Sequence, residues 1–187
     1  EAASGTTDSA TDTLVVSDAD GETVTWSCSG CTDAGTTQTL TGTYGAWVLT
    51  EATGAWAYTL NNADTDTDQL DAGDSVTDTL TAVATDSSGA SDSITVTVTV
   101  SGANDAPSTS TPSTQSGTED TTFTGYTISD FPFTDVDDGD SALTSITITV
   151  VESSGDLEKS TDGSSWTDVS ANDVILAAHI QHLRLAP

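Results

Sequence analysis

The chain has 187 residues and a mass of 18.9 kDa, which is enough for one large domain or two of about 100 residues. Thirty acidic residues stand against two basic ones, Lys159 and Arg184, so the formal net charge is -28 with both histidines neutral. Such a chain has no basic surface for nucleic acid or for an anionic membrane face. It also lacks an apolar run of bilayer length and a signal-peptide pattern, so we expect a mature or excised soluble segment.

Alternating apolar and polar residues argue against a disordered acidic tract, which the composition alone would allow. A period of two places the apolar residues on one face of a β-strand. The strands expected in chain order are residues 13–16, 23–26, 39–43, 46–50, 56–60, 76–85, 93–100, 123–128, 143–151 and 156–160. One short helix is expected at residues 171–178. Many short strands separated by Gly-bearing turns predict an all-β sandwich or barrel.

A domain boundary is expected where the composition changes. Residues 102–107 read Gly-Ala-Asn-Asp-Ala-Pro, and Pro107 is the first proline of the chain. The Ser/Thr/Pro-rich stretch that follows, to residue 117, offers no large apolar residue to anchor a core. We therefore predict two modules, residues 1–105 and 106–187.

Closely spaced acids in turns predict a metal ion. Asp18 and Asp20, and likewise Asp135 and Asp137, are two residues apart beside glycine, and a turn can aim such oxygens at one point. Calcium accepts about 6 to 8 oxygen ligands in irregular geometry, whereas magnesium demands a stricter octahedron. Zinc is disfavoured because no histidine or cysteine adjoins these acids. With so few basic residues to offset the repulsion, we expect calcium to neutralise the crowded carboxylates.

Two segments carry a family resemblance. Residues 44–49, 54–62 and 70–78, closing on residues 102–107, are similar to the VCBS repeat of giant RTX-type bacterial surface adhesins. Residues 119–121, 131–140 and 164–169 resemble the cadherin-like repeats that accompany it. The resemblance implies tandem Greek-key β-sandwiches, cadherin- or immunoglobulin-like, in a long calcium-stiffened extracellular stalk that acts in adhesion and biofilm formation and is not an enzyme. The usual second repeat extends past Pro187, so the second module resembles one that is truncated or completed by another segment.

By analogy with cadherin-like junctions, the resemblance also implies a set of ligands. One site between the modules would combine Glu1, Asp71, Asn104, Asp105, Asp135 and Asp137. Asp18, Asp20 and Asp86 would face a preceding repeat, and Glu119 a following one. The chain departs from the cadherin pattern at Gly102 and Gly73, where acidic residues are usual, which leaves the number of ions open.

Other residues admit two interpretations each. Cys28 and Cys31 have the spacing of a redox motif, but they lie between β segments, which favours a small loop-closing disulfide and an oxidising compartment. His179 and His182 are too few to make a metal site. The aromatic residues fit core packing better than a sugar-binding platform.

Two alternatives to the stalk remain open at this stage. One is a carbohydrate-binding module that uses exposed tryptophans to bind surface glycans. The other is a filament subunit whose second module accepts a strand from a neighbouring chain. Neighbouring repeats or adjacent subunits are the expected partners, outside the cell or on its surface, without nucleic acid or direct membrane insertion.

Overall fold

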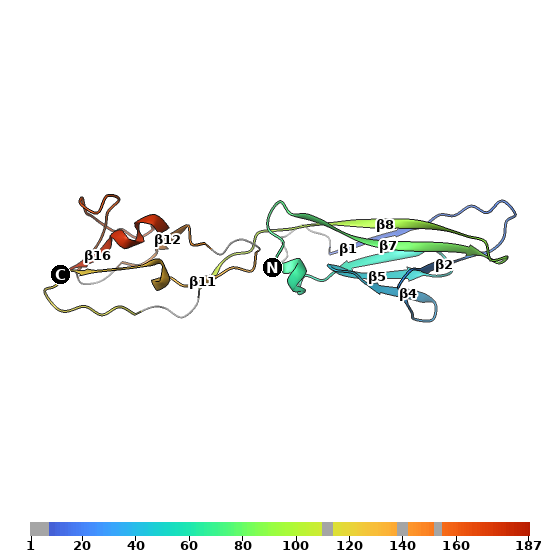
Figure 1. The fold of residues 1–187 in the computed structure, drawn as a ribbon, viewed down its shortest axis with the longest axis horizontal. Helices are drawn as coiled ribbons and strands as arrows, with labels where there is room; N and C mark the ends of the chain where they lie inside the picture. The colour runs from blue at the N-terminus through green and yellow to red at the C-terminus, as the bar shows by residue number, and fades with distance from the viewer. Residues whose placement is uncertain (1–7, 110–113, 138–141, 152–154) are drawn as a thin grey trace. The chain divides into compact units, whose positions relative to one another are not determined.

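The structure is a computed structural model that describes residues 8–109, 114–137, 142–151 and 155–187 (Figure 1). The predicted all-β class is confirmed, because the chain has 45% strand and 8% helix and is consistent with a β-sandwich, whereas the Greek-key topology stays a prediction. It divides into two compact units, unit 1 (Glu1–Asp105) and unit 2 (Ala106–Pro187). The division falls where the composition of the sequence changes.

Unit 1 consists of two antiparallel sheets and one short helix. The five-stranded sheet has the order β1-β6-β5-β4-β3, and the three-stranded sheet has the order β2-β7-β8. The five strands of the first sheet are β1 (Ser9–Thr13), β3 (Thr32–Asp33), β4 (Thr37–Thr41), β5 (Gly45–Thr50) and β6 (Ala55–Leu60). The second sheet contains β2 (Val24–Cys28), β7 (Ser75–Asp86) and β8 (Ser91–Ser101), and α1 (Thr65–Asp68) lies between β6 and β7.

The core of unit 1 is built from the inward-facing residues of both sheets. The alternation in β5 buries Trp47 and Leu49, and that in β7 buries Leu80, Ala82 and Ala84. Asp78 shares the inward face of β7 and is also buried. Its carboxylate accepts hydrogen bonds from Thr43 N and Tyr44 N, each at 3.0 Å, and from Tyr58 Oη at 2.8 Å. Asp78 therefore joins the three-stranded sheet to the β4–β5 turn and β6.

The longest hairpin of unit 1 joins β7 to β8 in an unbroken antiparallel register from Ser75↔Ser101 to Thr85↔Ser91. Its outward face carries cross-strand threonine pairs, with Thr81 opposite Thr95. The hydroxyl oxygens of those two residues are 3.5 Å apart. Threonine suits this position because its branched side chain fits a pleated, half-solvated surface.

The strand directions define two ends of unit 1. The base comprises the β4–β5 turn and the segment 60–74 between β6 and β7. At the base, Leu60 N donates to Asp8 O at 2.8 Å, and Ala103 N donates to Leu70 O at 3.1 Å. The tip comprises the turns 14–23, 51–54 and 87–90. The described chain therefore enters and leaves unit 1 at the base, with β7 and β8 running the length between base and tip (Figure 1).

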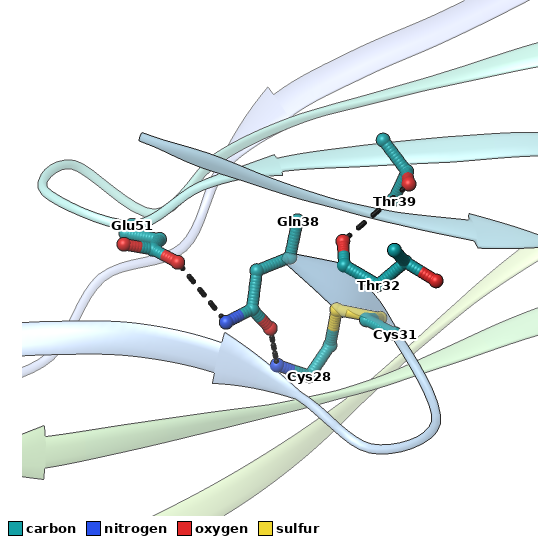
Figure 2. The surroundings of a disulfide bond; sticks show 6 residues. All are labelled: Cys28, Cys31, Thr32, Gln38, Thr39 and Glu51. Carbon is teal, nitrogen blue, oxygen red and sulfur yellow. Dashed lines mark hydrogen bonds between the residues drawn. A yellow bond between two sulfur atoms is a disulfide. The ribbon is translucent and has the colours of Figure 1, made fainter. Parts of the chain in front are cut away.

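A disulfide joins Cys28 to Cys31 where the chain crosses from β2 to β3 (Figure 2). The two Cα atoms are 5.5 Å apart. Beside the disulfide, Gln38 on β4 accepts a hydrogen bond from Cys28 N at 2.7 Å through Oε1 and donates from Nε2 to Glu51 Oε1 at 3.0 Å. The disulfide and Gln38 thus connect the two sheets at one edge of unit 1.

Unit 2 has shorter strands. Its four-stranded sheet has the order β10-β16-β13-β14, and two further pairs are β9 with β11 and β12 with β15. These are β9 (Ser108–Thr109), β10 (Phe123–Thr124), β11 (Phe133–Thr134), β12 (Ser145–Ile148), β13 (Asp156–Lys159), β14 (Thr167–Asp168), β15 (Asp173–Leu176) and β16 (Leu183–Ala186), with 3-10 turns η1 (Ile128–Asp130) and η2 (Ala177–His182). Its core centres on Val169, Ile175, Ile180 and Leu183.

Both basic side chains of the chain are engaged in unit 2. Lys159 Nζ lies 2.6 Å from Asp173 Oδ2, and this contact, followed by the Ser170 N–H, lowers the pKa of Asp173. Arg184 Nε donates to Glu158 Oε2 at 2.6 Å. The guanidinium also covers the ring of Trp166, 4.0 Å from its centroid, as a cation–π pair.

Two predicted elements are wrong in place or type, and two more are too long, since the strands expected at residues 123–128 and 143–151 are limited to Phe123–Thr124 and Ser145–Ile148. The first strand is Ser9–Thr13 rather than residues 13–16. Val15 and Val16 are 89% and 42% exposed, so these two apolar residues belong to the tip and not to the core. The helix expected at residues 171–178 is replaced by β15 and η2. The β-branched Val174 and Ile175 pair instead with Thr147 and Ile146 of β12.

Candidate metal centre

Three carboxylates converge at the tip of unit 1. Asp18, Glu22 and Asp86 each offer an oxygen, and these oxygens all lie within 4.8 Å of one another. All three residues are half-buried. Asp18 and Glu22 come from the β1–β2 loop, and Asp86 ends β7, where it pairs with Val24 of β2. Asp86 therefore shares one site with two residues that lie 64 and 68 positions before it in the sequence.

Local hydrogen bonds fix the loop that carries Asp18. Its Oδ1 accepts from Asp20 N at 2.8 Å and from Glu22 N at 3.3 Å. Between them Gly21 adopts φ +76°, a left-handed conformation that glycine tolerates best. This turn points residue 22 back toward Asp18, because the chain reverses within four residues.

The other two carboxylates are also held in place. Asp86 Oδ1 accepts from Ala90 N at 2.9 Å, which closes the β7–β8 turn. Glu22 accepts from Ser87 Oγ at 3.1 Å and from Ser88 Oγ at 2.8 Å. A carboxylate has about four acceptor sites. These bonds therefore orient the three groups and leave capacity for an ion.

The charge of this cluster has no basic side chain nearby in sequence to offset it. Residues 1–105 contain 17 acidic residues and no Lys, Arg or His. Three unit charges about 4 to 5 Å apart repel by roughly 3 to 4 kcal/mol per pair at an effective dielectric of 20. The donor set is oxygen only, which suits a hard divalent cation such as calcium.

The tip cluster differs from the predicted set in one member. Asp18 and Asp86 come together as grouped in the prediction, but Asp20 is exposed and Glu22 takes its place. Asp20 was predicted because it lies two residues after Asp18. The turn at Gly21 instead brings Glu22, four residues after Asp18, into the cluster. The tip is the end of unit 1 away from Asp8 and Gly102. That a preceding repeat faces the tip stays a prediction.

The predicted junction ligands are divided between the units. Asp71, Asn104 and Asp105 belong to unit 1, and Asp135 and Asp137 to unit 2. Glu1 and the acids Asp138 and Asp140 of the turn motif lie outside the described residues. A junction site that uses both units therefore remains a prediction.

On the unit 1 side, the chain leaving β8 passes close to Asp71. Gly102 N donates to Asp74 O at 3.0 Å, and a Cβ at residue 102 would lie 2.3 Å from Asp71 O. A side chain at position 102 would therefore collide with the backbone of Leu70 and Asp71. Residues 104 and 105 follow directly from it.

On the unit 2 side, Asp135 and Asp137 form one local turn. Asp137 is buried, at 4% exposure, and Asp135 is half-buried. Asp137 N donates to Asp135 Oδ1 at 3.4 Å. Glu119, the ligand assigned to a following repeat, is exposed in the loop before β10.

The four tryptophans all lie in the described ranges, and none is exposed. Trp26 and Trp47 are buried in the core of unit 1. Trp56 packs against Trp47 with ring centroids 5.5 Å apart, and Trp166 lies under Arg184. The structure therefore offers no open tryptophan platform for a sugar ring.

Comparison with models of known protein families finds no match, and comparison with curated proteins finds none either. Among the described residues, no helix combines the length and apolar character needed to cross a membrane.

Proposed function

We propose that the chain is a calcium-stiffened structural segment of a bacterial cell-surface or secreted adhesin, with no catalytic role. In this proposal the β-sandwich units act as spacers outside the cell, and calcium holds their acidic turns together. The VCBS and cadherin-like resemblance supports the class of protein. The tip cluster of Asp18, Glu22 and Asp86 supports the ion, and it is the observation on which the proposal depends.

The expected effect of calcium follows from mass action. Extracellular calcium modules bind with dissociation constants of about 10⁻⁴ to 10⁻³ M. At 10 mM calcium, one such site would stabilise the folded chain by about 1.4 to 2.7 kcal/mol. Magnesium should contribute less, because it requires a near-ideal octahedron that three carboxylates on two loops do not impose.

The test is thermal unfolding of the full chain in calcium, in magnesium and in EDTA, together with calorimetric titration of calcium. Glu22→Gln and Asp86→Asn keep the size and one acceptor oxygen of the native side chains but remove the charge, so each should lower the calcium-dependent shift and the calcium stoichiometry. Asp20→Asn is the matched control, since it removes the same charge from the same loop outside the cluster. Identical melting in calcium and EDTA would sink the proposal.

The carbohydrate-binding alternative receives no support from the tryptophans, which are buried or half-buried. Its test is glycan binding that disappears on Trp56→Ala or Trp166→Ala without loss of folding. Absence of glycan binding by the folded wild-type chain would eliminate it.

A further inference from the structure

The path of the chain through unit 1 has a mechanical consequence. Asp8 is held at the base by Leu60 N and by Asn62 Nδ2, which donates to Asp8 Oδ1 at 3.4 Å. Gly102 is held at the base by Asp74 O. All three partners belong to the segment 60–74 that joins β6 to β7. The two ends of the part of unit 1 that the structure describes are therefore anchored to the same short connection.

From this base the terminal strands run in opposite directions along the chain. The register of β1 starts at the base with Ser9↔Thr59 and ends toward the tip with Thr13↔Ala55. The register of β8 ends at the base with Ser101↔Ser75. Among the described residues, β1 is an edge strand of the five-stranded sheet and β8 is an edge strand of the three-stranded sheet, each paired on one side.

A pull between Asp8 and Gly102 thus acts across the strands and not along them. A load across an edge strand breaks its ladder pairs one after another, beginning at the base, because each pair carries the force only after the previous pair has opened. A load along the strands is shared by many pairs at once. The same unit must therefore resist the two directions of pull to different degrees.

We propose that unit 1 is an extensible element, which tension applied between Asp8 and Gly102 opens by peeling β1 from β6 and β8 from β7. The length released is large, because the two ends start at the same side of the unit. Residues 8–104 span about 320 to 350 Å when extended. The Cys28–Cys31 disulfide withholds only the two residues between the cysteines, so it does not stop this extension. The proposal rests on the proposed stalk function only for the origin of the tension.

The test is single-molecule force spectroscopy on the full chain with two pairs of attachment points. Asp8→Cys with Asn104→Cys pulls from base to base. Asp8→Cys with Ala90→Cys pulls from base to tip. The introduced positions are all exposed, and the native cysteines are already paired. Equal thermal stability of the two variants, measured first, ensures that they start from the same fold.

We expect the base-to-base pair to unfold unit 1 at a lower force than the base-to-tip pair, because the ladder hydrogen bonds lie perpendicular to the strands and are loaded in sequence by a pull across them. The extended lengths between the attachment points are about 320 to 350 Å and about 270 to 300 Å, respectively. The contour gain of the base-to-tip pair should fall short of its extended length by about 40 Å, the length of the 12-residue strand β7. A base-to-base force equal to or above the base-to-tip force would overturn the proposal. Repeating the measurement in EDTA separates the two proposals, because loss of the calcium effect refutes the metal site while the difference between the pulling directions depends only on the strand directions.

Discussion

Replacing Asp78 tests the central polar link of unit 1. This carboxylate is 5% exposed and accepts three hydrogen bonds, two from the β4–β5 turn and one from Tyr58. The backbone closes tightly on it, since a Cβ at Gly42 would lie 2.4 Å from Asp78 Oδ2. Loss of the carboxylate removes the acceptor of the buried Tyr58 hydroxyl and of the turn N–H groups of Thr43 and Tyr44.

The cost can be estimated bond by bond. A hydrogen bond to a charged group contributes about 1.5 to 3 kcal/mol, and a buried donor left unpaired costs about 1 to 3 kcal/mol. Asp78→Ala should therefore lower the free energy of unfolding by about 3 to 5 kcal/mol. Asp78→Asn should cost about 2 to 4 kcal/mol, because its amide NH₂ faces donors. Tyr58→Phe, which removes one bond, should cost about 1 to 2 kcal/mol.

Urea unfolding followed by tryptophan fluorescence measures these values, since three of the four tryptophans belong to unit 1. The double variant Tyr58→Phe/Asp78→Asn gives the coupling energy between the two side chains. A loss below about 1 kcal/mol for Asp78→Ala, or no coupling in the cycle, would refute the role assigned to this link.

Three further predictions concern titration and the disulfide. Burial, and then the hydrogen bond to Asp78, raise the pKa of Tyr58. The folded state thus holds this proton more tightly, and stability should fall above about pH 10 by up to ~1.4 kcal/mol per pH unit, less steeply in Tyr58→Phe. The N–H groups of Ser165 and Ser164 and the Ser160 hydroxyl lower the pKa of Asp162 to about 2. The contribution of Asp162 to stability should be complete above about pH 4 and lost as the pH falls from there through about 2. An acid titration of Asp162→Asn should not show this loss. Cys28→Ser/Cys31→Ser should cost about 2 kcal/mol in chemical denaturation, the chain-entropy value for so short a loop, and an unchanged midpoint would contradict it.

Strands with a clear period of two could be predicted from the sequence, and short ones could not. The alternation in β5, β7 and the second half of β8 follows directly from one face being buried. Two-residue strands such as β3 and β14 carry no measurable period, because their pairing depends on partners that are distant or on a turn. Val174 and Ile175 show the remaining ambiguity, since an apolar pair fits a helix turn and a short strand equally well.

The candidate site shows the same limit. Asp18 and Asp86 could be proposed from turn acids, but Glu22 could not be preferred over Asp20 by spacing alone. Its position depends on the left-handed backbone at Gly21 and on two serine hydroxyls from the β7–β8 turn. A glycine directly before an acid in a loop is the sequence signal that could have suggested it.

The threonine pairs on the outer face of β7 and β8 have one more consequence. The threonine face of the hairpin carries no charge. On the opposite register Asp78 is buried, Asp86 and Asp92 lie toward the tip, and Asp71 and Asp74 precede β7 at the base. Ionic strength should therefore act mainly on the two extremities. In dilute buffer, amide hydrogens of the turns should exchange faster while those between Thr77 and Thr81 keep their protection. The stability of the middle of the hairpin should therefore be independent of ionic strength, whereas that of its two ends should depend on it.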